Sequence, residues 1–183
     1  KTLILGYRCE RLAPLMQKPI LVLCYNRALA SKLQSAIKLK NLHPKVSVRT
    51  FHSWCSDQLR LYNVPTPPSG PDFFDAMVES VIASVERGQI PRAQYGAVMI
   101  DEGHDFKAEW LKVVTQMVDP STNSLLVLYD DARSIYDPNQ KRKFSFSSVG
   151  IQAQGRTTIL RLNYRNTSEV LSVAYDFAKD FMT

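Results

Sequence analysis

One run of apolar residues, Ala97 to Ile100, constrains the fold of this chain most, because two carboxylates follow it directly. The run has no polar alternation, which predicts a central strand of a parallel sheet, buried on both faces. In such sheets ligands bind beside the carboxyl ends of the strands, so we expect Asp101 and Glu102 to lie at a binding crevice. An acidic helix start is the alternative, because carboxylates also favour the first turn of a helix.

Further apolar runs alternate with helical patterns along the chain, which is typical of an α/β protein with a mostly parallel sheet flanked by helices. We expect strands at residues 20–25, 46–50, 97–100, 125–129 and 158–162. Apolar side chains recur at helical spacing around Leu33, Val81, Val113 and Ala174. Residues 64–71 are expected to form a loop, because prolines there prevent both helix and sheet pairing.

Composition narrows the classes of function. The chain has 183 residues, 45% of them hydrophobic, which suits one domain with a sizeable core. A formal net charge of +6 favours a polyanionic partner such as nucleic acid. No apolar run approaches the roughly 20 residues of a membrane span, so we expect no membrane association. Cys9, Cys24 and Cys55 lie in apolar or amphipathic segments, which predicts reduced thiols and a cytoplasmic location.

The other predicted strands also end in residues with binding chemistry. Thr50, Phe51 and His52 supply a hydroxyl, an aromatic face and an imidazole, which together can stack an unpaired base and bond a phosphate. The alternative is a helix start, with Thr50 as its cap and Phe51 in the core. Tyr164 and Arg165 pair a ring with a guanidinium, which suits a nucleobase and its phosphate. A surface ion pair is the alternative for Arg165.

Taken in chain order, these segments resemble the motifs of the UvrD/Rep-like superfamily 1 helicases. The likeness is carried by residues 23–26 (LCYN), 50–53 (TFHS), 101–105 (DEGHD), 130–136 (DDARSIY) and 163–166 (NYRN). The last four are similar to the TxH, DExQD, GDxxQSIY and NYRS motifs of that family. His104 and Arg133 each replace a family glutamine, so Arg133 brings a fixed positive charge and His104 a group that titrates near neutrality.

The resemblance implies a RecA-like P-loop NTPase domain that uses ATP and Mg²⁺. Glu102 is then the catalytic base, and Asp101 and Thr2 are the Mg²⁺ ligands, because Lys1 and Thr2 resemble the end of a GxGKT phosphate loop. The implied ATP-binding residues are Lys1, Thr2, Arg133, Tyr164 and Arg165. The implied nucleic-acid-binding residues are Asn26, Thr50, Phe51, His52 and Tyr136.

The resemblance also implies a domain organisation. Residues 1–167 would form the first RecA-like motor domain, with a small excursion at about 57–94, and residues 168–183 would lead toward a second motor domain missing from this chain. The expected function is that of an ATP-dependent DNA helicase or translocase acting on single-stranded DNA, with RNA as an open alternative. The glycines of the phosphate loop would precede Lys1, so the isolated chain is expected to bind ATP weakly and hydrolyse it negligibly.

Two other functions stay open. The first is a non-hydrolysing module that binds single-stranded nucleic acid through a RecA-like fold. The second is a metal-dependent nuclease built on Asp101, Glu102 and Asp105.

Overall fold

The computed structural model describes residues 2–129 and 145–158. The chain divides into two units, Lys1–Asp131 and Ala132–Thr183. The described part of the second unit contains the short 3-10 helix η4 (Ser147–Val149). Almost all of the strand predicted at 158–162, the helix predicted around Ala174 and the domain boundary predicted near residue 167 lie outside the described residues.

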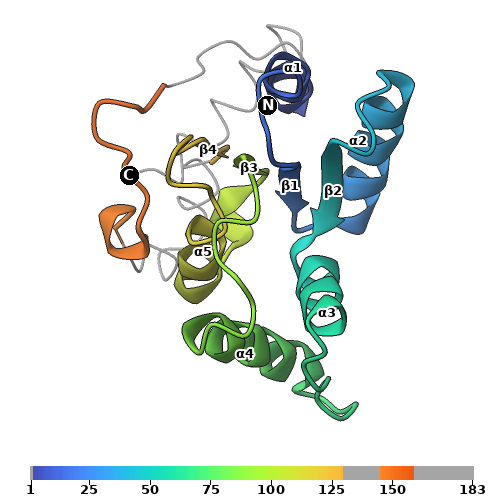
Figure 1. The fold of residues 1–183 in the computed structure, drawn as a ribbon, viewed down its shortest axis with the longest axis vertical. Helices are drawn as coiled ribbons and strands as arrows, with labels where there is room; N and C mark the ends of the chain where they lie inside the picture. Colours follow the sequence, from blue (N-terminus) through green and yellow to red (C-terminus); the bar gives the residue numbers. More distant parts are fainter. Residues whose placement is uncertain (1, 130–144, 159–183) are drawn as a thin grey trace, which may run out of the picture. The chain divides into compact units, whose positions relative to one another are not determined.

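The first unit is built on a four-stranded sheet (Figure 1). Its strands are β1 (Ile20–Cys24), β2 (Val46–Thr50), β3 (Ala97–Ile100) and β4 (Leu125–Val127). Their order is β2-β1-β3-β4, and every neighbouring pair is parallel. β1 and β3 are buried at every position, as uninterrupted apolar runs predict. β1 and β4 end one and two residues earlier than expected.

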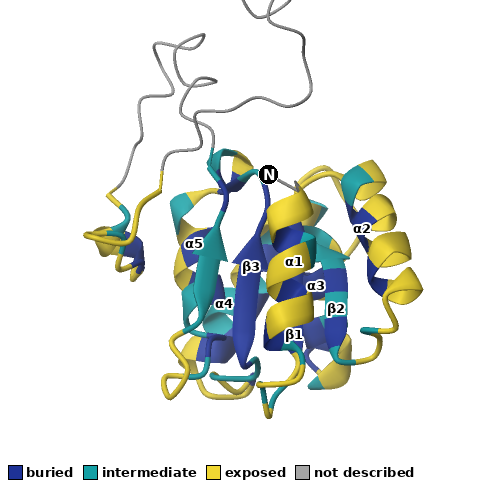
Figure 2. Ribbon diagram, turned by 90° about the horizontal axis from the view of Figure 1, so that it is seen from above, coloured by how far each residue is buried: buried dark blue, intermediate teal, exposed yellow. Residues whose placement is uncertain are grey.

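Helices cover both faces of the sheet (Figure 2). They are α1 (Thr2–Leu12), α2 (Arg27–Leu39), α3 (Phe51–Leu61), α4 (Phe73–Glu86) and α5 (Ala108–Thr115). Leu5 of α1 and Leu33 of α2 share one core cluster with Val22 and Met99 of the sheet, so these two helices pack on the same face. α3, α4 and α5 cover the opposite face. The predicted α/β fold with a parallel sheet between helices is confirmed.

The connections place a switch point at the centre of the sheet. From β1 the chain passes through α2 to β2, and from β2 it returns across β1 to β3 on the other side. The segments that leave β1 and β3 therefore diverge, and ligands of open α/β sheets bind in the crevice that such divergence creates. The first turn of α1 lies at this same end of the sheet, near the carboxyl end of β3 (Figure 2).

Two segments around β2 and α4 complete this unit. The proline-rich residues 64–71 form neither helix nor strand, as predicted, and they lead into α4. Among the described strands β2 pairs with β1 alone. On β2 the Val48 carbonyl accepts hydrogen bonds from Gln34 Nε2 and Arg49 Nη1, both at 2.9 Å.

None of the helices in the described ranges has the length and apolar character needed to cross a bilayer.

Candidate functional site

Asp101 is a buried carboxylate at the switch point. Its side chain follows β3 directly, it is 1% exposed, and its N–H donates to the Leu23 carbonyl of β1 at 2.9 Å. One carboxylate oxygen, Oδ1, accepts from the Glu102 N–H at 3.0 Å. Burial, reinforced by the charge of Asp101, raises the pKa of the neighbouring Cys24 thiol to about 12. The predicted acidic residue therefore lies between the two central strand ends.

The chain turns sharply after Asp101. Glu102 has left-handed backbone angles, φ 52° and ψ 50°, which cost a non-glycine residue about 1–3 kcal/mol. The next residue, Gly103, donates its N–H to the Leu128 carbonyl at 2.8 Å, and a Cβ atom on it would lie 2.5 Å from Val127 Cγ1. A glycine is thus needed to bring the short 3-10 helix η1 (Gly103–Asp105) against the end of β4. Such strain is found most often at functional sites.

His104 lies next to the two remaining carboxylates of the acidic segment. Its side chain is 10% exposed, and its Nε2 lies 3.5 Å from Glu102 Oε2 and 3.6 Å from Asp105 Oδ1. Neither nitrogen of the ring has a hydrogen-bond partner, and neither does Glu102 Oε2, although all three atoms are buried. Buried polar atoms in proteins are normally hydrogen-bonded, so this arrangement can receive a ligand that donates and accepts hydrogen bonds.

The carboxylate and imidazole side chains near Asp101 decide which kind of metal site can form there. No three or more His, Cys, Asp or Glu side chains within the described ranges are arranged to hold a metal ion. Mg²⁺ usually keeps several waters and is held by one or two carboxylates together with phosphates, so Asp101 fits a nucleotide-bound Mg²⁺. A nuclease that relies on a cluster of carboxylates gains no support from these residues.

The described ranges leave out several predicted nucleotide-binding residues. Thr2 is the first residue of α1, at the same end of the sheet as Asp101 (Figure 2). Four of the predicted ATP-binding residues lie outside the described ranges, namely Lys1, Arg133, Tyr164 and Arg165. Tyr136, a predicted nucleic-acid-binding residue, lies outside them as well.

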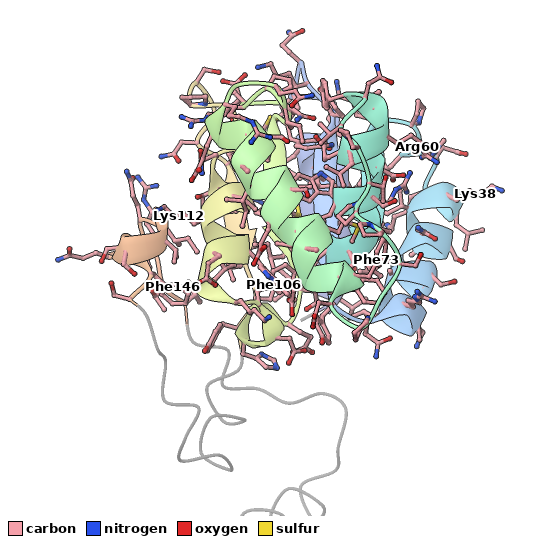
Figure 3. The ribbon with its side chains drawn as sticks, turned by 90° about the horizontal axis from the view of Figure 1, so that it is seen from below. Lys38, Arg60, Phe73, Phe106, Lys112 and Phe146 are labelled. Carbon is pink, nitrogen blue, oxygen red and sulfur yellow. The ribbon has the colours of Figure 1, made fainter. Side chains whose placement is uncertain are left out.

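A groove lies beside this crevice, at the carboxyl ends of β1 and β2. It has a volume of about 730 Å³, and α2, α3 and the start of α4 form its walls. Figure 3 views the molecule from the side of α4, with Phe73 at the end of α4 nearest α2. We call it the α2–α3–α4 groove, and its lining includes Tyr25, Arg27, Ser31, His52, Ser53 and Phe74.

Two predicted nucleic-acid-binding residues serve as helix caps beside the groove. Asn26 Oδ1 accepts from the N–H groups of Ala28 and Leu29 at the start of α2. Thr50 Oγ1 accepts from the Ser53 N–H at the start of α3. Asn26 follows β1, and Thr50 is the last residue of the neighbouring strand β2. The starts of α2 and α3 therefore lie side by side. Thr50 and His52 line the groove, and Asn26 lies between Tyr25 and Arg27, which are both part of the lining.

Phe51 does not have the position expected of a base-stacking residue. Its side chain is 0% exposed, and its ring stacks on Trp110 at a centroid distance of 4.5 Å. Trp54 and Phe106 contact two further sides of the ring. The prediction that Phe51 stacks on a base is therefore corrected, because no face of its ring is accessible. The alternative, a core residue at the start of a capped helix, describes it.

Two aromatic residues that the sequence interpretation missed are accessible in the groove. Tyr25 is 49% exposed and Phe74 is 52% exposed. The His52 ring lies edge-on to both, at 6.5 Å from Tyr25 and 5.1 Å from Phe74. Burial lowers the pKa of His52; the charge of Asp75 raises it by a smaller amount and that of Lys107 lowers it further, so the folded state favours the neutral imidazole. The sequence did carry a signal for both rings. Tyr25 directly follows the first apolar run, and Phe74 lies at the start of the helical pattern that follows the proline-rich residues 64–71.

No protein-family model matches this chain, and no curated protein matches it significantly.

Proposed function

We propose that this chain is the ATP-hydrolysing half of a single-stranded DNA translocase or helicase of the UvrD-like superfamily 1 type, with a RecA-like fold. The observation that carries the proposal is the buried Asp101 followed by the strained Glu102 at the switch point of a parallel sheet. Phosphoryl-transfer proteins of this architecture place an acidic pair at the same strand end. The likeness of the motifs supports ATP as the nucleotide.

Each residue of the acidic segment has a distinct part in the proposed reaction. Asp101 holds a hydrated Mg²⁺, which neutralises charge on the phosphates when bound. Glu102 orients the attacking water and accepts its proton. The turn at Gly103, where a side chain would clash with Val127, holds the backbone after Glu102 against the end of β4. His104, whose nitrogens are available, lies beside Glu102 Oε2 and can hold that carboxylate in place.

The α2–α3–α4 groove supports single-stranded nucleic acid as the second ligand. It combines exposed rings with hydroxyl groups and the Arg27 guanidinium, which together suit bases and phosphates. The groove and the crevice both lie at the carboxyl end of the sheet, on the two sides of β1. Nucleotide-dependent changes at Glu102 could therefore reach the groove through β1 and the segment that follows it.

A non-hydrolysing module that binds single-stranded nucleic acid is the second candidate. The observation in its favour is that the groove is formed entirely by described residues and uses none of the acidic segment. This candidate predicts oligonucleotide binding that is independent of ATP and of Asp101.

The test is ATP hydrolysis by the longest natural protein that carries this chain, measured with and without single-stranded DNA. The proposal requires hydrolysis that DNA stimulates and that Asp101→Asn abolishes. Glu109→Gln, an exposed carboxylate of α5, is the matched control and should leave the rate unchanged. Oligonucleotide binding without any ATP hydrolysis would establish the second candidate instead.

A further inference from the structure

We propose that the α2–α3–α4 groove holds an unpaired nucleobase against the rings of Tyr25 and Phe74. The inference rests on the nucleic-acid part of the proposed function and adds to it the residues that read the base. Tyr25 lies in residues 23–26, which carry part of the likeness to helicases, whereas Phe74 belongs to none of those segments. Phe51, one of the rings expected to contact a base, is buried.

Both rings are held in place by rings behind them. Tyr25 stacks on Trp110 at a centroid distance of 6.3 Å with 19° between the planes, and Trp110 is itself 5% exposed. Phe74 contacts the edge of His52, which in turn lies 5.1 Å from Trp110. Each ring thus keeps about half of its surface accessible on a rigid support. A pre-organised ring loses little conformational entropy on binding, which favours stacking of a base.

The charges around the groove fit a phosphate backbone. Arg27 forms no ion pair within the described part of the chain and lies in the wall beside Ser31. The one acidic side chain of the lining, Asp57, is neutralised by Arg49 at 3.0 Å and Arg60 at 2.6 Å. No unbalanced negative charge therefore opposes a phosphate in this groove.

The surrounding segment is free of acidic residues. Between Glu10 and Asp57 the sequence contains only basic charged residues, namely Arg11, Lys18, Arg27, Lys32, Lys38, Lys40, Lys45 and Arg49. This segment includes β1, α2, β2 and the start of α3, which form the groove together with the start of α4. In that part of α4 the carboxylate of Asp75 is paired with Lys107 at 2.9 Å. The charge favours a polyanion over an apolar peptide as the occupant. Stacking on Tyr25 and Phe74 requires exposed base faces, so the polyanion is single-stranded.

The test compares two probes of equal length, about 12 nucleotides, within the usual range for such sites. One is fluorescein-labelled oligothymidylate, and the other is the same sugar-phosphate chain without bases. Binding of each is measured by fluorescence anisotropy with this chain at fixed salt. The wild type should bind the oligothymidylate at least about tenfold more tightly, because only that probe has bases that can stack on the two rings.

The variants Tyr25→Ala and Phe74→Ala should each reduce that preference about 5-fold or more, while affinity for the abasic chain stays unchanged. Unchanged abasic affinity also shows that each variant is folded. Tyr25→Phe and Phe74→Tyr keep a ring and should retain the preference. Tyr7→Ala, which removes a 68% exposed ring of α1 outside the groove lining, is the control and should behave as the wild type.

The results separate this inference from the proposed function. A wild type that prefers oligothymidylate, with both alanine variants retaining that preference, overturns the inference and leaves single-stranded binding intact. Equal affinity of the wild type for both probes also overturns it, because binding then depends on phosphates alone. A wild type that binds neither probe removes the nucleic-acid part of the proposed function.

Discussion

Phe51 and Trp110 stack with their ring centroids 4.5 Å apart and their planes 17° from parallel, and both rings are buried. This contact joins the start of α3 to α5 beneath the α2–α3–α4 groove. It supports the exposed Tyr25 ring, which stacks on the same Trp110. The two rings are therefore a structural base for the groove and not its binding surface.

This contact predicts that Phe51→Ala destabilises the protein. Removing a buried phenylalanine costs about 3–5 kcal/mol, because the cavity that remains collapses only in part. Urea unfolding followed by circular dichroism measures the change. Phe74→Ala is the comparison, since a side chain that is 52% exposed should cost much less. Equal losses for the two variants would contradict the assignment of Phe51 to the core.

A second prediction concerns the turn after Glu102. Gly103→Ala places a Cβ atom 2.5 Å from Val127 Cγ1 and should cost about 1–3 kcal/mol of unfolding free energy. Val127→Ala in the same chain removes the clashing methyl group, so the double variant should recover part of that loss. Gly6→Ala is the control, because nothing lies within 4 Å of its Cβ position, and in a helix the change should stabilise by about 0.5–1 kcal/mol. Additive effects at 103 and 127 would show that the clash is relieved elsewhere.

The stability of the protein should depend on pH through His52. Burial lowers the pKa of His52 below its ordinary value of 6.5, so the folded state favours the neutral imidazole. The stabilisation is complete above the unfolded-state pKa and is lost as pH falls below about 6.5, because the unfolded state then takes up the proton more readily. Urea midpoints at pH 7.5 and 5.5 should differ more for the wild type than for His52→Gln. A wild type and a variant with the same pH dependence would contradict the effect.

Glu102→Gln should separate hydrolysis from nucleotide binding. The amide keeps the size of the side chain but accepts no proton from water, so ATP hydrolysis should fall about 10²- to 10⁴-fold while nucleotide affinity is nearly preserved. Steady-state hydrolysis and nucleotide titration are measured in the longest natural protein that carries the chain, with Glu109→Gln as the control. Hydrolysis at the parent rate would mean that the acidic segment has a structural role.

Removal of Asp57 should strengthen nucleic-acid binding. Asp57→Asn releases Arg49 and Arg60 from their ion pairs, and exposed pairs of this kind contribute only about 0–1 kcal/mol to stability. Affinity for oligothymidylate should rise, and the slope of its logarithm against that of salt should steepen by about 0.7 for each additional phosphate contact. Glu10→Gln, which breaks the ion pair with Lys40 away from the groove lining, is the matched control. Weaker binding by Asp57→Asn would mean that Asp57 positions the arginines for the ligand.

The sheet could be predicted from the sequence because a buried strand is marked by a local run of apolar residues. Uninterrupted apolar runs located β1 and β3, with at most one residue of error at their ends. The carboxylate at Asp101 was placed correctly for the same reason, since a residue that follows a central strand must lie at the edge of the sheet.

The groove was harder to predict, because its geometry depends on elements that are distant along the chain. Asn26 and Thr50 have side chains that suit a helix cap as well as a ligand, and one sequence does not distinguish these uses. The burial of Phe51 requires Trp110 from α5. Tyr25 and Phe74 lie in one groove only because α4 returns to the end of β1.

The hydrogen bonds that Gln34 and Arg49 donate to the Val48 carbonyl have a consequence for self-association. A strand from another molecule that adds to the edge of a sheet needs the backbone acceptors of that edge. At Val48 the acceptor is already used, and the Arg49 guanidinium stands beside it. The protein should therefore resist edge-to-edge aggregation at β2, and Gln34→Ala should make it more prone to form fibrils at high concentration.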